Sequence, residues 1–517
     1  MREEESAAQR LRFAGLAAAA CLALTAPRLL LHELWRDEAW LWLVAAESRS
    51  LADLLGPLAR SGQGYLFPLL CYLARQVSTS PLAMQALHLV LVAAAAFVFA
   101  RWAPFGRRER ALFLLGYFPF YEYAVLSRHY VLGALLLWVA CVAVRGRRPL
   151  LLGAALGLLC QTTVYGFILA LAVACAAGVA WFLPKDLRDL KDPKDGLSGA
   201  GLAAGLALAL AGAVAGLIQL IPLPGTSFAP EWHFGWEPAQ ALKALAMPWR
   251  AFVPLPLLKV QFWNTNLLDA SPGSQAVLGV LVLALGVALL WRRPVALAAF
   301  CLGTAGILAF GYVKYAGVLR HQGHEWLLFA AALWLSGAPF LRAEGRRSWR
   351  SRALLALLLV HVLAGIWASW VDLRHPFSNG AATAELIRSE GLDRYPLLGH
   401  REPPAATVAL ALGRPLYSPS RRRFVTYPDW GPEQREMNDA ELRCTARELA
   451  RREGGDIVLV INRELPPWGE LDAAGSRTGA IQSSEDYHLY RLRHARLDPT
   501  APEAQCANEV SGAGARE

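Results

Sequence analysis

The chain has 517 residues, of which 55% are hydrophobic and only 18% are charged. Soluble proteins carry about 25% charged residues, so this composition excludes a soluble multidomain protein and indicates a membrane protein. It also excludes a disordered chain, and the length excludes a small disulfide scaffold. The net charge of +10 would suit nucleic-acid binding, but residues 371–517 carry 19 Arg and no Lys against 22 acidic residues. The excess positive charge therefore lies in the first 370 residues, and we expect no nucleic-acid partner.

Short basic clusters separate the apolar segments of these first 370 residues. Lys and Arg stay on the cytoplasmic side of a membrane because moving them across it is costly. Clusters that recur after every second apolar segment therefore predict a cytoplasmic amino terminus. The clusters are Arg2/Arg10/Arg12, Arg101/Arg107/Arg108/Arg110, Arg145/Arg147/Arg148, Lys185/Arg188/Lys191/Lys194, Arg292/Arg293 and Arg342/Arg346/Arg347/Arg350/Arg352.

The apolar segments predict eleven membrane spans. An odd number that starts inside leaves the last segment, 371–517, outside. The first span is expected to remain as an anchor, because it is long, is interrupted by Arg28 and lacks a small-residue cleavage site. We therefore expect an α-helical polytopic membrane domain over 1–370 and a soluble exterior domain over 371–517. The predicted spans are 13–34, 81–100, 111–127, 130–144, 149–162, 166–183, 199–220, 276–291, 294–312, 326–341 and 353–370.

The third to sixth predicted spans are short. A helix needs about 20 residues to cross the hydrocarbon core, whereas 111–144 and 149–183 each hold a hairpin in about 35 residues. Their outer turns are therefore expected below the outer membrane surface, in a recessed cavity. Arg128, His129 and Glu122 at such depth need water, a partner or a ligand. The alternative is that Glu122 and Arg128 simply pair with each other.

Two long outer loops are predicted. The loop from Trp35 to about Ser80 is expected to form interfacial helices over Leu51–Arg60 and Tyr65–Arg75. Trp35, Trp40 and Trp42 would anchor it at the lipid headgroups. The second loop, 221–275, contains the aromatic motif Glu231-Trp232-His233-Phe234-Gly235-Trp236. This motif would suit a sugar platform, a membrane-surface lid or an interfacial belt.

The composition after Trp370 is that of an ordinary soluble protein. Alternating helices and strands predict a small α/β domain, with no glycine pattern for phosphate binding and no metal-spaced His/Cys cluster. Cys444 and Cys506 are expected to form a disulfide, because an exterior compartment permits oxidation. The predicted helices are Ala381–Gly391, Pro403–Leu412 and Asp439–Arg452, and the predicted strands are Tyr395–His400, Arg422–Tyr427, Asp456–Asn462 and Tyr487–Arg493.

Two groups of residues could carry chemistry. Asp37 and Glu38 follow the first span, and adjacent carboxylates that are costly to dehydrate make one of them a candidate base. The alternative is a helix N-terminal cap. The second group consists of cations on the same predicted side of the membrane, which would suit an anionic lipid headgroup; a solvated basic loop is the alternative for its later members. These cations are Arg128, His129, Lys314, Arg320, His321 and His324.

The sequence resembles the polytopic GT-C glycosyltransferases, and within them the bacterial protein O-mannosyltransferase and aminoarabinose-transferase group. Arg36-Asp37-Glu38-Ala39-Trp40 resembles the acidic motif of the family's first loop, and Ser127-Arg128-His129-Tyr130 its fourth-span entry. Arg320-His321-Gln322-Gly323-His324 resembles its later phosphate-binding loop. One departure is the segment 62–68, which reads Gly-Gln-Gly-Tyr-Leu-Phe-Pro where many relatives have a His-Pro-Pro-Leu-like step.

The resemblance implies transfer of a sugar from a polyprenyl-phosphate donor to a lipid, glycan or protein acceptor on the outer face. Asp37 would be the general base, and Glu38 would orient the acceptor or replace Asp37. The phosphate of the donor would be bound by Arg128, His129, Lys314, Arg320 and His321. The anomeric centre would be inverted, and no metal or cofactor is indicated.

Two other classes of function remain open. A lipid or sugar transporter or flippase would also bury charges, although such proteins usually show internal repeats and none is visible in this sequence. A non-catalytic accessory membrane protein is the other alternative. The preference for Arg over Lys suggests a bacterial inner membrane, with the active site facing the periplasm.

Overall fold

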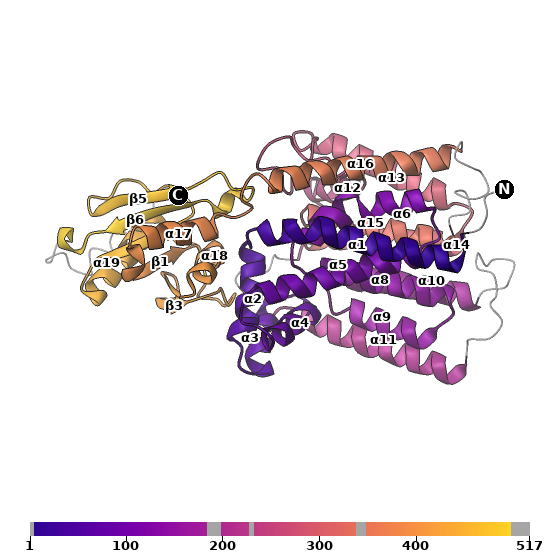
Figure 1. Ribbon diagram of the computed structural model, residues 1–517, viewed down its shortest axis with the longest axis horizontal. Coiled ribbons are helices and arrows are strands. Elements are labelled where there is room, and N and C mark those ends of the chain that lie inside the picture. Colours follow the sequence, from indigo (N-terminus) through magenta and orange to yellow (C-terminus); the bar gives the residue numbers. More distant parts are fainter. Residues whose placement is uncertain (1–4, 183–197, 227–231, 338–347, 498–517) are drawn as a thin grey trace. The chain divides into compact units, whose positions relative to one another are not determined.

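The computed structural model describes residues 5–182, 198–226, 232–337 and 348–497 of the chain (Figure 1). The chain divides into two compact units. The first, here called the helical unit, comprises Met1–Leu31, Ser61–Pro222 and Ala229–Val371. The second, the α/β unit, comprises His32–Arg60, Leu223–Phe228 and Asp372–Glu517. The start of the predicted first outer loop thus belongs to the same unit as the carboxyl-terminal segment.

Seven helices among the described residues are long and apolar enough to cross a membrane. Their outward side chains are apolar too: Leu206 and Ile218 on α11, for example, are 61% and 70% exposed. Such surfaces are costly in water and favourable against lipid, so the chain is a helical membrane protein. The seven helices are α1 (Ala7–Leu31), α5 (Leu82–Trp102), α10 (Val164–Phe182), α11 (Gly199–Leu220), α13 (Pro272–Leu290), α14 (Pro294–Val313) and α16 (Trp349–Asp372).

The other predicted spans form shorter or interrupted helices, so the count of eleven and the orientation stay predictions. The expected span 111–127 consists of α6 (Arg107–Leu114), the π-helical turn η1 (Phe118–Glu122) and the short α7 (Tyr123–Val125). Pro119 lacks the backbone N–H that a continuing α-helix would use there. The remaining predicted spans correspond to α8 (Tyr130–Arg145), α9 (Pro149–Leu159) and α15 (Leu319–Leu335), while two further helices are α4 (Leu66–Arg75) and α12 (Pro238–Phe252).

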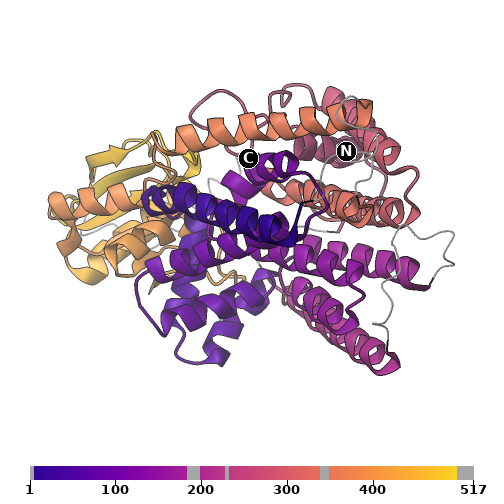
Figure 2. The same ribbon diagram turned by 45° about the vertical axis from the view of Figure 1, so that its right-hand side comes forward.

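Glycines allow α9 and α11 to pack at very short range. The two helices lie side by side in both views (Figures 1 and 2). A Cβ atom added to Gly153 would lie 1.9 Å from the carbonyl oxygen of Gly205, and one added to Gly157 would lie 2.7 Å from that of Leu208. Small residues are what permits such close backbone approach between membrane helices.

Arg28 joins three elements of the helical unit. It lies on α1 and is 5% exposed. Its guanidinium donates hydrogen bonds to Ser369 Oγ on α16 at 2.7 Å and to the carbonyl oxygen of Phe120 in η1 at 2.9 Å. These bonds provide acceptors for the buried Arg28 guanidinium inside the helical unit.

The α/β unit contains a six-stranded mixed sheet in the order β3-β2-β1-β4-β6-β5. β1 is parallel to both β2 and β4, whereas the pairs β2/β3, β4/β6 and β5/β6 are antiparallel. The strands are β1 (Leu397–His400), β2 (Leu416–Ser418), β3 (Arg423–Val425), β4 (Ile457–Ile461), β5 (Leu471–Arg477) and β6 (Tyr487–Leu492). The α/β character predicted for the tail is therefore present.

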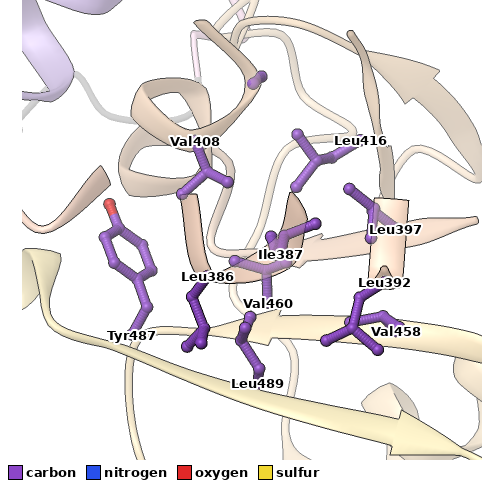
Figure 3. Close-up of a cluster of buried hydrophobic side chains, with 11 residues drawn as sticks. Leu386, Ile387, Leu392, Leu397, Val408, Leu416, Val458, Val460, Tyr487 and Leu489 are labelled. Atoms are coloured by element: carbon purple, nitrogen blue, oxygen red, sulfur yellow. The ribbon is translucent and has the colours of Figure 1, made fainter. Parts of the chain in front are cut away.

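Helices cover both faces of this sheet. On one face, α17 (Gly380–Ser389) and α18 (Glu402–Leu412) pack Ile387 and Val408 against Val460 and Leu489 (Figure 3). On the other face, α19 (Asp439–Glu453) contributes Leu442 and Leu449 to a second core cluster with Leu459. Each predicted helix and strand of the tail lies within about two residues of an observed one; β2 and β5 were not predicted.

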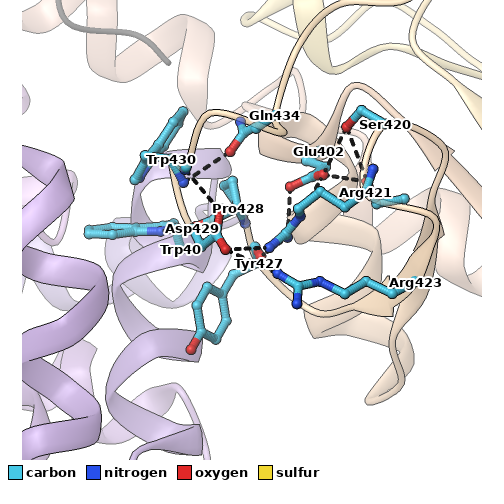
Figure 4. A network of polar contacts seen from close by, with 12 residues as sticks. Trp40, Glu402, Ser420, Arg421, Arg423, Tyr427, Pro428, Asp429, Trp430 and Gln434 are labelled. Carbon is cyan, nitrogen blue, oxygen red and sulfur yellow. Dashed lines mark hydrogen bonds and ion pairs between the residues drawn. The ribbon is translucent and has the colours of Figure 1, made fainter. Parts of the chain in front are cut away.

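The tryptophans predicted as headgroup anchors are buried, so that prediction is wrong. Trp35, Trp40 and Trp42 are each no more than 2% exposed. Trp40 lies on α2 (Arg36–Glu47), which is followed by α3 (Leu51–Ser61). Its indole N–H donates to the carbonyl oxygen of Pro428 at 2.8 Å (Figure 4). These side chains therefore serve packing in the protein rather than contact with lipid.

The Pro428 loop is itself held in place by a buried arginine. Arg421 donates to Glu402 Oε2 at 2.8 Å and to the carbonyl oxygen of Tyr427 at 2.9 Å, and it pairs with Asp429 at 2.8 Å (Figure 4). Because the Arg421 and Glu402 side chains are each only 3% exposed, loss of either would leave a buried charge behind. Arg421, through its contacts with Glu402 and Asp429, thus holds the loop whose Pro428 carbonyl oxygen accepts the Trp40 indole N–H.

Cys444 on α19 is disulfide-bonded. The six other cysteines among the described residues are free thiols. Cys506 lies outside the described residues, so its pairing with Cys444 stays a prediction.

Candidate functional site

Four of the predicted phosphate-binding residues come together in the helical unit, from segments almost 200 positions apart. Arg128 and His129 lie in the turn before α8, and Arg320 and His321 lie in the first turn of α15. The Tyr130 hydroxyl is 3.2 Å from His321 Nε2, across 191 residues of sequence. We call these four residues the cationic cluster.

The members of the cationic cluster lie close enough to interact electrostatically with one another. His129 is close enough to Arg128 and Arg320 to interact with both, and His321 interacts with the same two arginines and with His129. Arg128 and His129 are only 4% and 5% exposed. Arg128 and Arg320 thus bring two guanidinium groups to one place, and because a guanidinium presents paired N–H donors that match phosphate or carboxylate oxygens, this arrangement suits an anionic ligand.

Tyrosines line the cationic cluster. Tyr123 donates its hydroxyl to the carbonyl oxygen of Arg320 at 2.7 Å, and its ring stacks on that of Tyr130 with centroids 5.3 Å apart. The Tyr165 ring stacks on the rings of His321 and His324, with ring centroids 5.7 and 5.0 Å apart, respectively. These tyrosines were not predicted as site residues. Their position at the ends of short predicted spans, next to the expected cavity, could have indicated them.

Glu122 and Arg128 have partners other than each other. Glu122 in η1 accepts hydrogen bonds from the Tyr117 hydroxyl at 2.8 Å and from the Trp263 indole at 3.1 Å. Arg128 donates to Gln63 Oε1 at 3.0 Å. Each of the two residues therefore has partners besides the other, and the expected pairing of Glu122 with Arg128 stays a prediction.

Trp263 connects Glu122 to the cationic cluster. The Arg320 guanidinium lies over the Trp263 ring, 5.0 Å from its centroid, while the indole N–H of the same ring faces the Glu122 carboxylate. A carboxylate and a cation thus share one aromatic side chain. Trp263 was not predicted, because it lies in a long loop without a recognisable motif around it.

The segment that departs from the family pattern lies beside Arg128. Gln63, its second residue, supplies the acceptor for Arg128. The next residue is Gly64, where an added Cβ atom would lie 2.0 Å from the Gln161 carbonyl oxygen. Any larger residue than glycine at position 64 would therefore displace the outer turn of the predicted 149–183 hairpin.

Lys314 packs on the aromatic motif of the predicted second outer loop. Its ammonium nitrogen is 4.7 Å from the centre of the Trp232 ring, which stacks on Phe234. Trp232 and Phe234 are 57% and 77% exposed. The motif's first residue, Glu231, lies outside the described residues.

Asp37 and Glu38 lie in the first turn of α2, in the α/β unit. Glu38 is fully buried, and its Oε2 accepts the backbone N–H of Trp35 at 3.3 Å as part of a capping box. The same oxygen is 3.3 Å from His32 Nε2. Glu38 therefore has the capping role that the sequence left open as an alternative, while Asp37 is half-buried and interacts electrostatically with Glu485.

Several charged residues surround the start of α2. Glu485 accepts the backbone N–H of Arg36 at 3.1 Å, and burial raises the pKa of Glu485 to about 7. Glu33 accepts the backbone N–H of Phe377 at 2.8 Å, and burial raises the pKa of Glu33 as well. None of these residues was predicted, because their relation to Asp37 depends on contacts between distant segments.

No group of three or more His, Cys, Asp or Glu side chains in the described ranges is arranged to hold a metal ion. A comparison with models of known protein families and with curated proteins finds no match to this chain.

Proposed function

We propose that the chain is an integral-membrane glycosyltransferase of the GT-C type, which moves a sugar from a polyprenyl-phosphate donor to a lipid, glycan or protein acceptor. The observation that supports this most is the convergence of Arg128, His129, Arg320 and His321 on one cluster, in which Arg128 and His129 are buried. Residues chosen from two short, distant motifs meet there, and charge-assisted hydrogen bonds from the two guanidinium groups would bind the phosphate of a lipid headgroup.

The cationic cluster would stabilise the leaving group. As the bond between the anomeric carbon and the phosphate oxygen breaks, the electron pair stays on that oxygen and the polyprenyl phosphate gains negative charge. Cations already in place in a site with little water stabilise this charge without reorganising. Arg128 and Arg320 offer forked donors that match two phosphate oxygens, and Lys314 would add a point charge.

Asp37 would act on the acceptor. A hydroxyl is a weak nucleophile until a base removes its proton while the new bond forms, a task worth roughly 10²–10⁴ in rate. The Asp37 carboxylate would take that proton as the acceptor oxygen attacks the anomeric carbon opposite the phosphate, which inverts the configuration. Glu38 would contribute by holding the first turn of α2, since its carboxylate caps that turn.

The proposed function requires a particular orientation of the chain in the membrane. Eleven spans with a cytoplasmic amino terminus would put the α/β unit and Asp37 outside, in the periplasm of a bacterial inner membrane. The donor phosphate would then be reached from the outer leaflet.

One experiment tests the activity and the base together. The purified protein in lipid is given a panel of radiolabelled polyprenyl-phosphate sugars and acceptor lipids, and consumption of each donor is measured. We expect one donor to be consumed by the wild type and by the Asp53→Asn variant, a control that alters an exposed carboxylate on α3. Asp37→Asn should lower turnover at least about 100-fold and leave donor binding within a few-fold of wild type.

Two outcomes would contradict this. Turnover of Asp37→Asn above about a tenth of wild type would exclude Asp37 as the base. If instead the protein moved the intact labelled lipid between leaflets without cleaving it, the chain would be a flippase.

A further inference from the structure

The first turn of α2 is tied to the segment that follows α16. Glu33 binds the backbone of Phe377, and the Arg36 side chain donates to Ser484 Oγ at 3.3 Å. The His32 ring lies against the Phe377 ring with centroids 4.5 Å apart. All these residues belong to the α/β unit, so the turn that carries Asp37 is held by side chains on both sides of it.

His32 lies at the centre of this arrangement, between two carboxylates. Its Nε2 is 3.3 Å from Glu38 Oε2 and its Nδ1 is 3.3 Å from Asp372 Oδ1. The side chains of His32 and Glu38 are fully buried, and that of Asp372 is 3% exposed. A ring that bridges two acceptors must carry a proton on each nitrogen, because neutral imidazole has one donor and one acceptor.

The charges around His32 favour that doubly protonated form. Burial alone would lower the pKa of His32, but Asp372 and Glu38 outweigh it and raise this pKa to about 10. Glu33 adds a further carboxylate near the ring. The imidazolium therefore persists at physiological pH, and the carboxylates facing it come from α2, from the end of α16 and from its own segment.

We propose that His32 is a positioning residue for Asp37: its imidazolium links Glu38, in the first turn of α2, to Asp372 and so fixes the backbone turn on which Asp37 is presented. The inference rests on the proposed function, in which Asp37 is the base. His32 does not touch substrate; it acts through Glu38, one residue from Asp37.

Loss of the imidazolium would leave Glu38 and Asp372 facing one another with no cation between them. Two buried carboxylates in that position repel each other, and the capping hydrogen bond that the Trp35 backbone N–H donates to Glu38 would weaken. The first turn of α2 would then open more often. A general base displaced by about 1 Å can lower the rate by about 100-fold, with little effect on a donor bound elsewhere.

The test compares His32→Gln with His488→Gln in the full-length protein in lipid. His488 is a half-buried histidine on β6 of the same unit, so its replacement controls for loss of an imidazole. For His32→Gln we expect kcat to fall between about 10- and 100-fold, with the donor KM within about two-fold of wild type. Hydrogen exchange at residues 36–40 should accelerate, while exchange in β4 stays as in the wild type. His488→Gln should change neither.

Two further measurements exclude a merely structural role. The wild-type kcat should fall as pH rises through about 10, where the His32 imidazolium loses its proton, and His32→Gln should lack this fall. Adding Asp372→Asn to His32→Gln removes the repulsion and should restore slow exchange at residues 36–40 with part of kcat.

The outcomes separate this inference from the proposed function. If the wild type transfers sugar and His32→Gln matches it in kcat and in exchange at residues 36–40, the positioning role is wrong and the transferase stands. Accelerated exchange throughout the α/β unit would also overturn it, in favour of a general stabilising role. A wild type that consumes no donor would overturn the proposed function, and the positioning role with it.

Discussion

Glu470 illustrates how much a single carboxylate contributes to the α/β unit. Arg443 donates to its two oxygens at 2.9 and 3.0 Å, and Arg447 donates to Oε1 at 2.6 Å. Burial acts to raise the pKa of Glu470, but the two arginines outweigh it and lower this pKa to about 2. A carboxyl group whose pKa is lower in the folded than in the unfolded state stabilises the fold above its unfolded pKa of about 4.3.

We predict that Glu470→Gln lowers the local opening free energy by about 2 kcal/mol at pH 7, because charge-assisted bonds to both arginines are lost. The difference from wild type should shrink as pH falls from about 4.3 towards 2, since Glu470 then becomes protonated. Hydrogen exchange in β4 measures this. Glu453→Gln is the control: it alters a more exposed ion pair with Arg452 and should change the opening free energy by less than about 1 kcal/mol. A constant difference between Glu470→Gln and wild type across that pH range would contradict the argument.

Arg128 provides the residue-scale test of the phosphate site. Arg128→Ala should weaken binding of the donor lipid strongly, and Arg128→Lys should restore only part of it, because an ammonium lacks the guanidinium's forked donors. Binding is measured by titrating labelled polyprenyl-phosphate sugar. Arg101→Ala, at the carboxyl end of α5, serves as the control. Unchanged donor affinity in a less stable Arg128→Ala protein would mean that Arg128 only supports the fold.

At the scale of single residues, the positions of charged groups could be predicted from the sequence more readily than the structural role of each group. Asp37 and Glu38 were recognisable as a pair, but their division into a half-buried carboxylate and a buried cap depends on where α2 begins. His32 was not singled out, because its importance comes from Asp372, 340 positions away. Arg128, His129, Arg320 and His321 could be singled out because basic residues are conspicuous at the ends of apolar segments.

At the scale of elements, the pair α9 and α11 depends on glycine. We predict that Gly153→Val disrupts this pair, because a side chain there would collide with the backbone of Gly205, and overpacking of this kind costs about 1–3 kcal/mol. The thermal midpoint of the purified protein should fall, and hydrogen exchange in both helices should accelerate. Gly178→Val is the matched control, since no atom outside its own helix lies within 4 Å of the added Cβ. Equal midpoints for the two variants would refute the close contact.

Elements were predicted well where their pattern is local and poorly where it is not. β4 was found from its apolar residues, all five of which are buried. β5 was missed because Leu471–Arg477 is an edge strand with few apolar residues and a bulge at Ala473–Gly475. The span expected over 111–127 was predicted as one helix because hydropathy does not register the interruption at Pro119.

At the scale of the whole molecule, the cysteines test the predicted exterior location of the carboxyl-terminal segment. We expect non-reduced peptides from protein purified under oxidising conditions to contain Cys444 linked to Cys506. A closed loop of about 60 residues would stabilise the unit by about 4 kcal/mol in the chain-entropy account. Mass spectrometry before and after reduction decides the pairing, and Cys444→Ser is the control. Two free thiols would contradict both the bridge and its use as support for an oxidising compartment.

Composition was sufficient to recognise a helical membrane protein with an α/β segment at its end, since burial of apolar surface dominates both. It was not sufficient to define the compact units. Residues 32–60 appear from hydropathy to be an interfacial loop, yet they belong to the α/β unit because Trp40 and the charges around His32 find their partners after position 371. Only long-range packing reveals this.

The assembly of the α/β unit from separate parts of the chain has a consequence for its biosynthesis. His32 leaves the ribosome 340 residues before Asp372. At roughly 5–20 residues per second, this delay is about 17 to 70 s, far longer than an isolated helix needs to form. Throughout that interval the tryptophans of α2 and the His32 ring exist without the surface that buries them. The nascent chain must therefore be shielded, by lipid or by a chaperone, until translation of the residues from Asp372 onward supplies the missing partners.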